Sequence, residues 1–334
     1  MQRHMFFIAG MMLVLAGCNG MFFFPYRTQV LSPDQLGLKY EDVYFPARDG
    51  TLLHAWFLPG TSRVQGTILF LHGNAENIST HIMSVRWLPA QGFNVFLLDY
   101  RGYGESAGEP SVEGLQDDVD SALRTLIARP DVSPDRLVVF GQSLGGAIAI
   151  YNVAHSPYRR HIRGLAVESA FSSYRGIARE KLSDFWLTWP LQYPLSWLVS
   201  DQYSAARAVA DISPIPLLII HGDSDPIVPV EYGRRLFELA REPKELWVVP
   251  GSGHIQAFQR QTYRDRFVVW LKQVLFAAPR VQIDACLDCT RCVSVTPIAL
   301  RYSRAFTAAQ PLADDPEYPL HSDRHQHAPG STHR

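Results

Sequence analysis

A serine between glycines stands where it could act as a nucleophile. The string GQSLG at residues 141–145 centres on Ser143, follows a short apolar run over 137–140 and precedes a helical stretch over 147–154. This order of strand, turn and helix is the setting of a G-x-S-x-G nucleophile elbow. A serine held in such a tight turn brings the neighbouring backbone so close that the residues two before and two after it have room only for glycine. The plainer alternative is a glycine-rich turn without chemistry.

Two downstream residues supply the chemistry that such a serine needs. A serine hydroxyl is a weak nucleophile until a base accepts its proton and a carboxylate orients that base. Asp225 lies in the string HGDSDPIVP after the apolar run 216–220, and His254 ends the string GSGH after the run 246–249. The order serine, acid, histidine differs from the orders of chymotrypsin and subtilisin and is that of α/β hydrolases. We therefore expect Ser143, Asp225 and His254 to form a catalytic triad.

Acyl transfer also needs hydrogen-bond donors for the oxyanion that forms on the substrate carbonyl. The backbone N–H of Leu144 can supply one, because it opens the helix after the nucleophile, where the helix terminus adds positive potential. The string HGNA at 72–75 follows the apolar run 67–71, and we expect the backbone N–H of Asn74 to be the second donor. We interpret His72 as a packing residue that shapes this loop. Such a site requires no metal ion and no organic cofactor.

The elements around these residues alternate as in an α/β protein. Segments 41–46 and 52–58 flank the turn signal Arg48-Asp49-Gly50 and predict an antiparallel hairpin. Helical spacing of apolar residues predicts helices over 119–127 and 267–275. Short continuous apolar runs predict strands buried on both faces, over 67–71, 95–98, 137–140, 165–167, 216–220 and 246–249. The sequence thus predicts a mostly parallel central sheet with helices on both faces.

The segment 171–213 interrupts this alternation. It is rich in aromatic residues, is broken by Pro190 and Pro194, and lies between two predicted strands. We interpret it as a small helical cap, because an insertion here lies near the carboxyl ends of the strands, where ligands bind in such folds. The alternative is an ordinary crossover helix with a longer lead-in, since Trp and Tyr are common core residues. As a cap, the aromatic insertion predicts an apolar acyl pocket.

The composition of the chain excludes several classes of protein. Among 334 residues, 47% are hydrophobic, and 31 Lys and Arg nearly balance 32 Asp and Glu. A chain this apolar can bury a core and is not wholly disordered. A chain with a net charge of -1 lacks the basic excess that neutralises phosphates, so nucleic acid is not expected as a partner. The length fits either two domains or one α/β domain with insertions.

The N-terminus has the layout of a secretory signal peptide. Arg3 precedes an apolar run over 5–15, and small residues lead to Cys18. The ending LAGC resembles a bacterial lipobox, which implies cleavage before Cys18 and lipidation of that cysteine. We expect residues 1–18 to be signal and anchor, and Asn19 favours the outer membrane facing the periplasm. The alternative is one uncleaved transmembrane anchor, because the apolar stretch resumes at 21–24.

The C-terminal residues 279–334 form a polar, Pro-rich tail without periodicity. Cys286, Cys289 and Cys292 are spaced C-x-x-C-x-x-C, and four His residues follow. Three thiolates and a histidine could close a zinc site. The absence of a fourth nearby cysteine favours a disordered extension whose thiols oxidise. We therefore predict three parts after the signal: a linker over 19–37, a hydrolase domain over 38–278 and this tail.

Five motifs in order resemble the Bem46 branch of the α/β hydrolases, within the broader serine aminopeptidase and monoglyceride lipase-like group. They are HGNA at 72–75, DYRGYGES at 99–106, GQSLGG at 141–146, HGDSDPIVP at 221–229 and GH at 253–254. The resemblance implies Ser143 as nucleophile, His254 as base and Asp225 rather than Asp223 as orienting acid. It also implies that Asp99 and Arg101 are structural, fixing a loop by an ion pair.

Relatives in this branch remove palmitoyl groups from proteins, which implies hydrolysis of acyl esters or thioesters at a membrane. We therefore expect a membrane-anchored serine hydrolase that acts on an apolar or lipid-like acyl substrate, with no cofactor and no nucleic acid. Two alternatives stay open: a serine peptidase of the same fold, because amides and esters share this chemistry, and a non-catalytic lipoprotein scaffold on a hydrolase fold.

Overall fold

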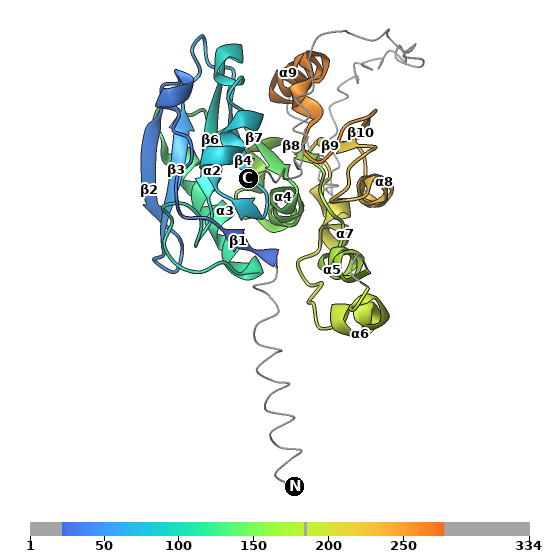
Figure 1. Ribbon diagram of the computed structural model, residues 1–334. Helices are drawn as coiled ribbons and strands as arrows, with labels where there is room; N and C mark the ends of the chain where they lie inside the picture. The colour runs from blue at the N-terminus through green and yellow to red at the C-terminus, as the bar shows by residue number, and fades with distance from the viewer. Residues whose placement is uncertain (1–21, 184–185, 277–334) are drawn as a thin grey trace, which may run out of the picture. The chain divides into compact units, whose positions relative to one another are not determined.

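An eight-stranded sheet forms the centre of the described domain (Figure 1). The computed structural model describes residues 22–183 and 186–276. The strand order is β10-β9-β8-β7-β4-β6-β3-β2, and neighbours are parallel except that β3 pairs antiparallel with both β6 and β2. The strands are β2 (Glu41–Pro46), β3 (Leu52–Leu58), β4 (Gly66–Leu71), β6 (Phe93–Asp99), β7 (Leu137–Gln142), β8 (Ile162–Glu168), β9 (Leu217–Gly222) and β10 (Lys244–Val249). The predicted mostly parallel sheet and its N-terminal hairpin are confirmed.

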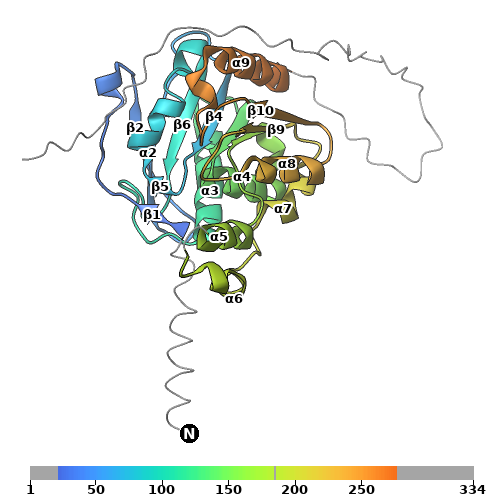
Figure 2. The same ribbon diagram turned by 45° about the vertical axis from the view of Figure 1, so that its right-hand side comes forward.

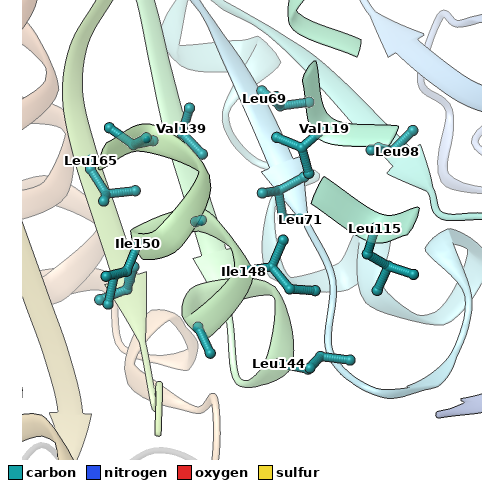
Figure 3. Packing of buried hydrophobic residues seen from close by; sticks show 14 of the residues in the cluster. Leu69, Leu71, Leu98, Leu115, Val119, Val139, Leu144, Ile148, Ile150 and Leu165 are labelled. Carbon is teal, nitrogen blue, oxygen red and sulfur yellow. The ribbon is translucent and has the colours of Figure 1, made fainter. Parts of the chain in front are cut away.

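Side chains alternate between the two faces of the sheet along each central strand, and helices bury both faces. On β4, Leu69 and Leu71 join one apolar cluster, whereas Ile68 and Phe70 join the other. Figure 3 shows Leu69 and Leu71 among side chains of the helices α3 and α4. The first face is covered by α3 (Val112–Ala128), α4 (Leu144–His155) and α8 (Val230–Leu239), and the second by α2 (Ile78–His81) and α9 (Gln261–Phe276). Helices on both faces are thus confirmed.

Arg101 fixes the loop after β6 by an ion pair, but not with Asp99. Its guanidinium donates to both carboxylate oxygens of buried Asp118 on α3 and, at 2.8 Å, to Asp49 in the β2–β3 turn. Asp99 instead accepts a hydrogen bond from the backbone N–H of Ile78 at 3.0 Å. The structural role inferred for Arg101 therefore involves residues that are distant in the sequence.

The segment between β8 and β9 is helical, and its middle part is exposed. It contains α5 (Tyr174–Ser183), a 3-10 turn (Trp189–Leu191), α6 (Gln192–Ser196), α7 (Ala205–Ala208) and a second 3-10 turn (Val209–Ile212). Its N-terminal part packs on the body, since Tyr174 and Ile177 are buried. Trp186, Trp189 and Trp197, by contrast, point into solvent, with Trp186 78% and Trp197 73% exposed. These tryptophans are therefore not core residues.

The first described residues pair with the loop after β4. The strand β1 (Phe24–Pro25) lies parallel to β5 (Ala75–Glu76) in a separate two-stranded sheet, and a 3-10 turn follows at Asp34–Leu36. Residues 22–37, the described part of the stretch expected as a linker, thus contact the HGNA loop, where the Phe24 N–H donates to the Asn74 carbonyl at 2.9 Å. None of the described helices has the length and apolar character needed to cross a bilayer. Cys18 lies outside the described residues.

Candidate active site

Ser143 occupies a strained turn between β7 and α4. Its φ of 53° lies in the left-handed region, where a side chain is costly, and its backbone N–H donates to the Glu168 carbonyl at 2.9 Å. A Cβ added to Gly145 would lie 2.2 Å from the Leu71 carbonyl oxygen, and one on Gly141 would lie 2.4 Å from the Gly145 carbonyl oxygen. These contacts are the physical reason for the two glycines of the motif.

Asp225 and His254 are in direct contact. His254 Nδ1 lies 2.8 Å from Asp225 Oδ2, while Asp225 Oδ1 accepts hydrogen bonds from the N–H groups of Ile227 and Val228, each at 2.9 Å. Burial opposes ionisation of Asp225, but the bonds from His254 and the two backbone groups outweigh it, so the pKa of Asp225 lies below its ordinary value. His221 bonds to the Val228 carbonyl at 2.8 Å and holds this loop in place.

Asp223 has a different position from Asp225. It is exposed, and its carboxylate accepts hydrogen bonds from the Gly251 N–H at 2.7 Å and from the Ser224 hydroxyl at 2.9 Å. Asp223 therefore ties the loop after β9 to the loop after β10. Of the two acids, Asp225 is the one that contacts His254.

The three residues share one edge of the sheet. Ser143 follows β7, Asp225 follows β9 and His254 follows β10, and these strands run parallel with β8 between β7 and β9. Their carboxyl ends therefore open at the same edge. This is where ligands bind in open α/β sheets. The arrangement can support nucleophilic attack by a serine whose proton passes to a histidine held by a carboxylate.

The expected oxyanion donors are the backbone N–H groups of Leu144 and Asn74. Leu144 is the first residue of α4, and Asn74 lies in the loop after β4. Neither N–H donates to another described residue. His72 Nδ1 lies 2.8 Å from the Gly73 carbonyl oxygen and so fixes the peptide that carries the Asn74 N–H. Burial holds the pKa of His72 well below its usual range, so the ring stays neutral and packs against Tyr100 and Tyr103.

Comparisons with known proteins decide the family. Residues 62–211 match the family described as serine aminopeptidase, S33. The chain is 40% identical over 261 residues to the uncharacterized protein YfhR of Escherichia coli K12, covering 76% of this chain and 87% of YfhR. It is 33% identical to the α/β hydrolase domain-containing protein WAV2 of Arabidopsis thaliana (74% and 83% covered) and 30% identical to bem46 of Schizosaccharomyces pombe (66% and 72%). This chain is an α/β hydrolase of the Bem46 branch.

Solved structures agree on the fold of this hydrolase. The Pyrococcus furiosus esterase Pf2001 superimposes with a TM-score of 0.61 at 23% identity, covering 76% of this chain and 97% of the esterase. Acetyl xylan esterase 1 from Thermoanaerobacterium gives 0.56 at 18% identity, with 71% and 84% covered. At this identity the similarity establishes the fold alone.

Glu168 is a buried acid of this hydrolase that sequence reasoning missed. It ends β8, and its carboxylate accepts hydrogen bonds from Gln142 Nε2 at 2.7 Å and from the Ala257 N–H at 2.8 Å. It thereby joins the residue before Ser143 to the loop that carries His254. Burial raises the pKa of Glu168 above its ordinary value. The signal in the sequence was an acidic residue directly after the apolar run 165–167.

His81 is a second missed residue beside the hydrolase site. A Cβ built on Gly73 would lie 3.3 Å from His81 Cε1 and 3.7 Å from Ser143 Cβ, so His81 and Ser143 flank the same glycine. Desolvation lowers the pKa of His81, and the nearby His254 lowers it further. His81 is therefore a neutral neighbour at neutral pH. Its position at the end of α2, in a string without a motif, gave no signal.

No group of three metal-binding side chains occurs within residues 22–183 and 186–276. Cys286, Cys289 and Cys292, the residues of the alternative zinc site, lie outside this part of the chain.

Proposed function

We propose that this chain is a membrane-anchored serine hydrolase that cleaves carboxylic ester or thioester bonds of apolar acyl substrates through an acyl-enzyme. The observation that carries the proposal is the 2.8 Å contact of His254 Nδ1 with Asp225 Oδ2, at the sheet edge where Ser143 occupies the elbow. A neutral imidazole held by a carboxylate on one nitrogen can accept a proton on the other.

In the proposed mechanism, Ser143 Oγ attacks the carbonyl carbon while His254 Nε2 accepts the hydroxyl proton. The N–H groups of Leu144 and Asn74 bind the resulting oxyanion. Collapse of this intermediate breaks the bond to the alcohol or thiol, which leaves with the proton from His254. Water then attacks the acyl-enzyme, and His254 takes one water proton and returns it to Ser143 as the acid departs.

The proposed anchor is a lipid on Cys18. Its support is the apolar run 5–15 followed by LAGC at 15–18. An enzyme tethered by this cysteine, at the outer membrane facing the periplasm, meets acyl chains that are themselves held in a bilayer. The proposed preference for an apolar acyl group rests on this location and on the resemblance to the Bem46 branch.

Hydrolysis of p-nitrophenyl esters from acetyl to palmitoyl tests the proposal on the full chain. We expect activity that is lost in Ser143→Ala and retained in Ser62→Ala, which removes the hydroxyl of an exposed serine before β4. The acyl chain length that is hydrolysed fastest would indicate the length of the acyl pocket. Equal rates for Ser143→Ala and the unmodified chain would refute the assignment, and a folded chain with no activity on any ester would favour a non-catalytic scaffold.

A serine peptidase is the second candidate, and the description of the matching family as a serine aminopeptidase favours it. Aminoacyl-p-nitroanilides distinguish the two. A rate on these amides that exceeds the rate on every ester, and that is lost in Ser143→Ala, would replace the ester assignment with a peptidase.

A further inference from the structure

The helical insertion carries a surface that a protein in free solution does not normally expose. Six large apolar side chains lie within twelve residues and are each at least half exposed: Trp186, Leu187, Trp189, Leu191, Tyr193 and Trp197. We call this set the cap aromatic surface. Exposed apolar side chains that cluster in this way mark interaction sites, and Trp and Tyr are the residues that favour the boundary between water and lipid.

The start of the described chain lies beside this insertion. The ring of Phe22 packs edge-to-face against Tyr174 of α5, with 5.4 Å between ring centroids. Figures 1 and 2 both show β1 next to α5, with α6 beyond α5 and α9 at the opposite end of the domain. Phe24 and Tyr26, which follow Phe22 closely in the chain, are exposed, whereas Phe23, between Phe22 and Phe24, is buried. Apolar side chains therefore gather at the end of the domain where the chain enters it.

The distance to the proposed anchor is short. Phe22 lies four positions after Cys18, and a fully extended chain spans at most about 3.5 Å per residue, or roughly 14 Å in all. A lipid on Cys18 therefore brings the insertion close to the plane of the membrane.

The helix α5 beside the cap aromatic surface carries three basic residues, Arg175, Arg179 and Lys181, against one acid, Glu180, and this excess of positive charge suits lipid phosphates. Arg179 of α5 lies over the Tyr193 ring at 5.5 Å, and Arg175 lies one turn earlier on the same helix. An aromatic face with arginines at its border is the pattern of segments that lie in the interface of a bilayer. A second protein chain would not require the anchor and this surface to share one end of the domain.

We propose that the cap aromatic surface docks on a phospholipid bilayer, so that the insertion rests in the interface while the lipidated cysteine holds the chain there. The consequence for substrate is that the active site takes acyl esters from the membrane rather than from solution. This consequence rests on the proposed ester hydrolysis, whereas the docking itself does not.

Quenching of tryptophan fluorescence by brominated phospholipid tests the docking directly. The full chain is reconstituted in vesicles of phosphatidylcholine and phosphatidylglycerol, with or without bromine on the acyl chains. Because three of seven tryptophans lie on the surface, we expect bromine to remove up to about two fifths of the emission. Trp189→Phe with Trp197→Phe should lose most of this quenching. The matched control Val269→Trp adds a tryptophan at an exposed position on α9, at the far end, and should add only unquenched emission.

A second assay links docking to substrate supply. The double variant Trp189→Asp and Trp197→Asp is assayed on an ester embedded in a bilayer and on a soluble short-chain ester. The ratio of the first rate to the second should fall about tenfold relative to the unmodified chain. If a chain that hydrolyses soluble esters shows equal tryptophan emission in plain and brominated vesicles, the docking is refuted and the proposed hydrolase stands. Quenching without any ester hydrolysis would uphold the docking and refute the hydrolase. A dimer in detergent that the double Asp variant abolishes, together with unquenched emission, would assign the surface to a second copy of the chain.

Discussion

Replacing Asp225 by asparagine separates the orienting carboxylate from the rest of the site. The amide keeps the shape of the side chain, and its oxygen can still accept from the N–H groups of Ile227 and Val228, which now bond to Oδ1. Its NH₂ group then faces His254 Nδ1, where Oδ2 now lies at 2.8 Å. A donor at this place favours the histidine tautomer whose proton is on Nε2, and that tautomer cannot accept a proton from Ser143.

The expected loss follows from this change of tautomer. We expect kcat/KM for p-nitrophenyl butyrate to fall about 10⁴-fold, as when an orienting carboxylate becomes an amide in a serine triad. This is about 5.5 kcal/mol of transition-state stabilisation, at roughly 1.4 kcal/mol per factor of ten. The matched control is Asp223→Asn, which changes an exposed acid that only contacts Gly251 and Ser224.

The assay compares both variants with the unmodified chain after circular dichroism has shown that they are folded. If kcat/KM of Asp225→Asn falls by less than about tenfold, the orienting role is refuted, because the wrong histidine tautomer lowers kcat/KM by more than that. A large loss in Asp223→Asn with little loss in Asp225→Asn would exchange the roles of the two acids.

Three further predictions concern stability and the anchor. Burial raises the pKa of Glu168 in the folded state above its ordinary 4.5, so the contribution of its protonated form to folding stability is complete below pH 4.5 and is lost as pH rises through the folded pKa. The melting temperature of Glu168→Gln should therefore rise relative to that of the unmodified chain between pH 4 and pH 8. A difference in melting temperature that stays constant over this range would contradict the argument from burial. The Cβ of Gly145→Ala would lie 2.2 and 2.4 Å from backbone oxygens, and the variant should lower the free energy of unfolding in urea by about 3 kcal/mol. Gly50→Ala, where the added Cβ has open space but φ is positive, should lower it by about 1 kcal/mol. Equal losses in the two variants would show that the backbone around Ser143 can shift to make room for the added methyl group. Cys18→Ala should abolish incorporation of an alkyne fatty acid in cells, and labelling that persists would place the lipid elsewhere.

The sheet and the positions of the site residues were predictable because each is encoded locally. A buried parallel strand reads as a short apolar run, and each of Ser143, Asp225 and His254 follows such a run within a few residues. The parallel order of the strands then brings their carboxyl ends to one edge. Motif and strand together were enough to expect the contact between Asp225 and His254, which the structure contains.

Contacts between distant residues were not predictable from local patterns. Arg101 pairs with Asp118 and Asp49, which lie 17 and 52 positions away, rather than with the acid of its own motif. The pairing of β1 with β5 depends on two residues in each strand, too few to leave a periodic pattern. The sequence of the insertion likewise could not show that its tryptophans face solvent, because Trp fills cores and interfaces alike.

The most direct test of the central claim is to find the residue that a serine-directed reagent modifies. The full chain is treated with a fluorophosphonate, digested and analysed by mass spectrometry. The account predicts one phosphonyl adduct on Ser143, lost in His254→Ala because the hydroxyl then has no base. A folded chain that remains unmodified, or an adduct on another serine, would contradict it.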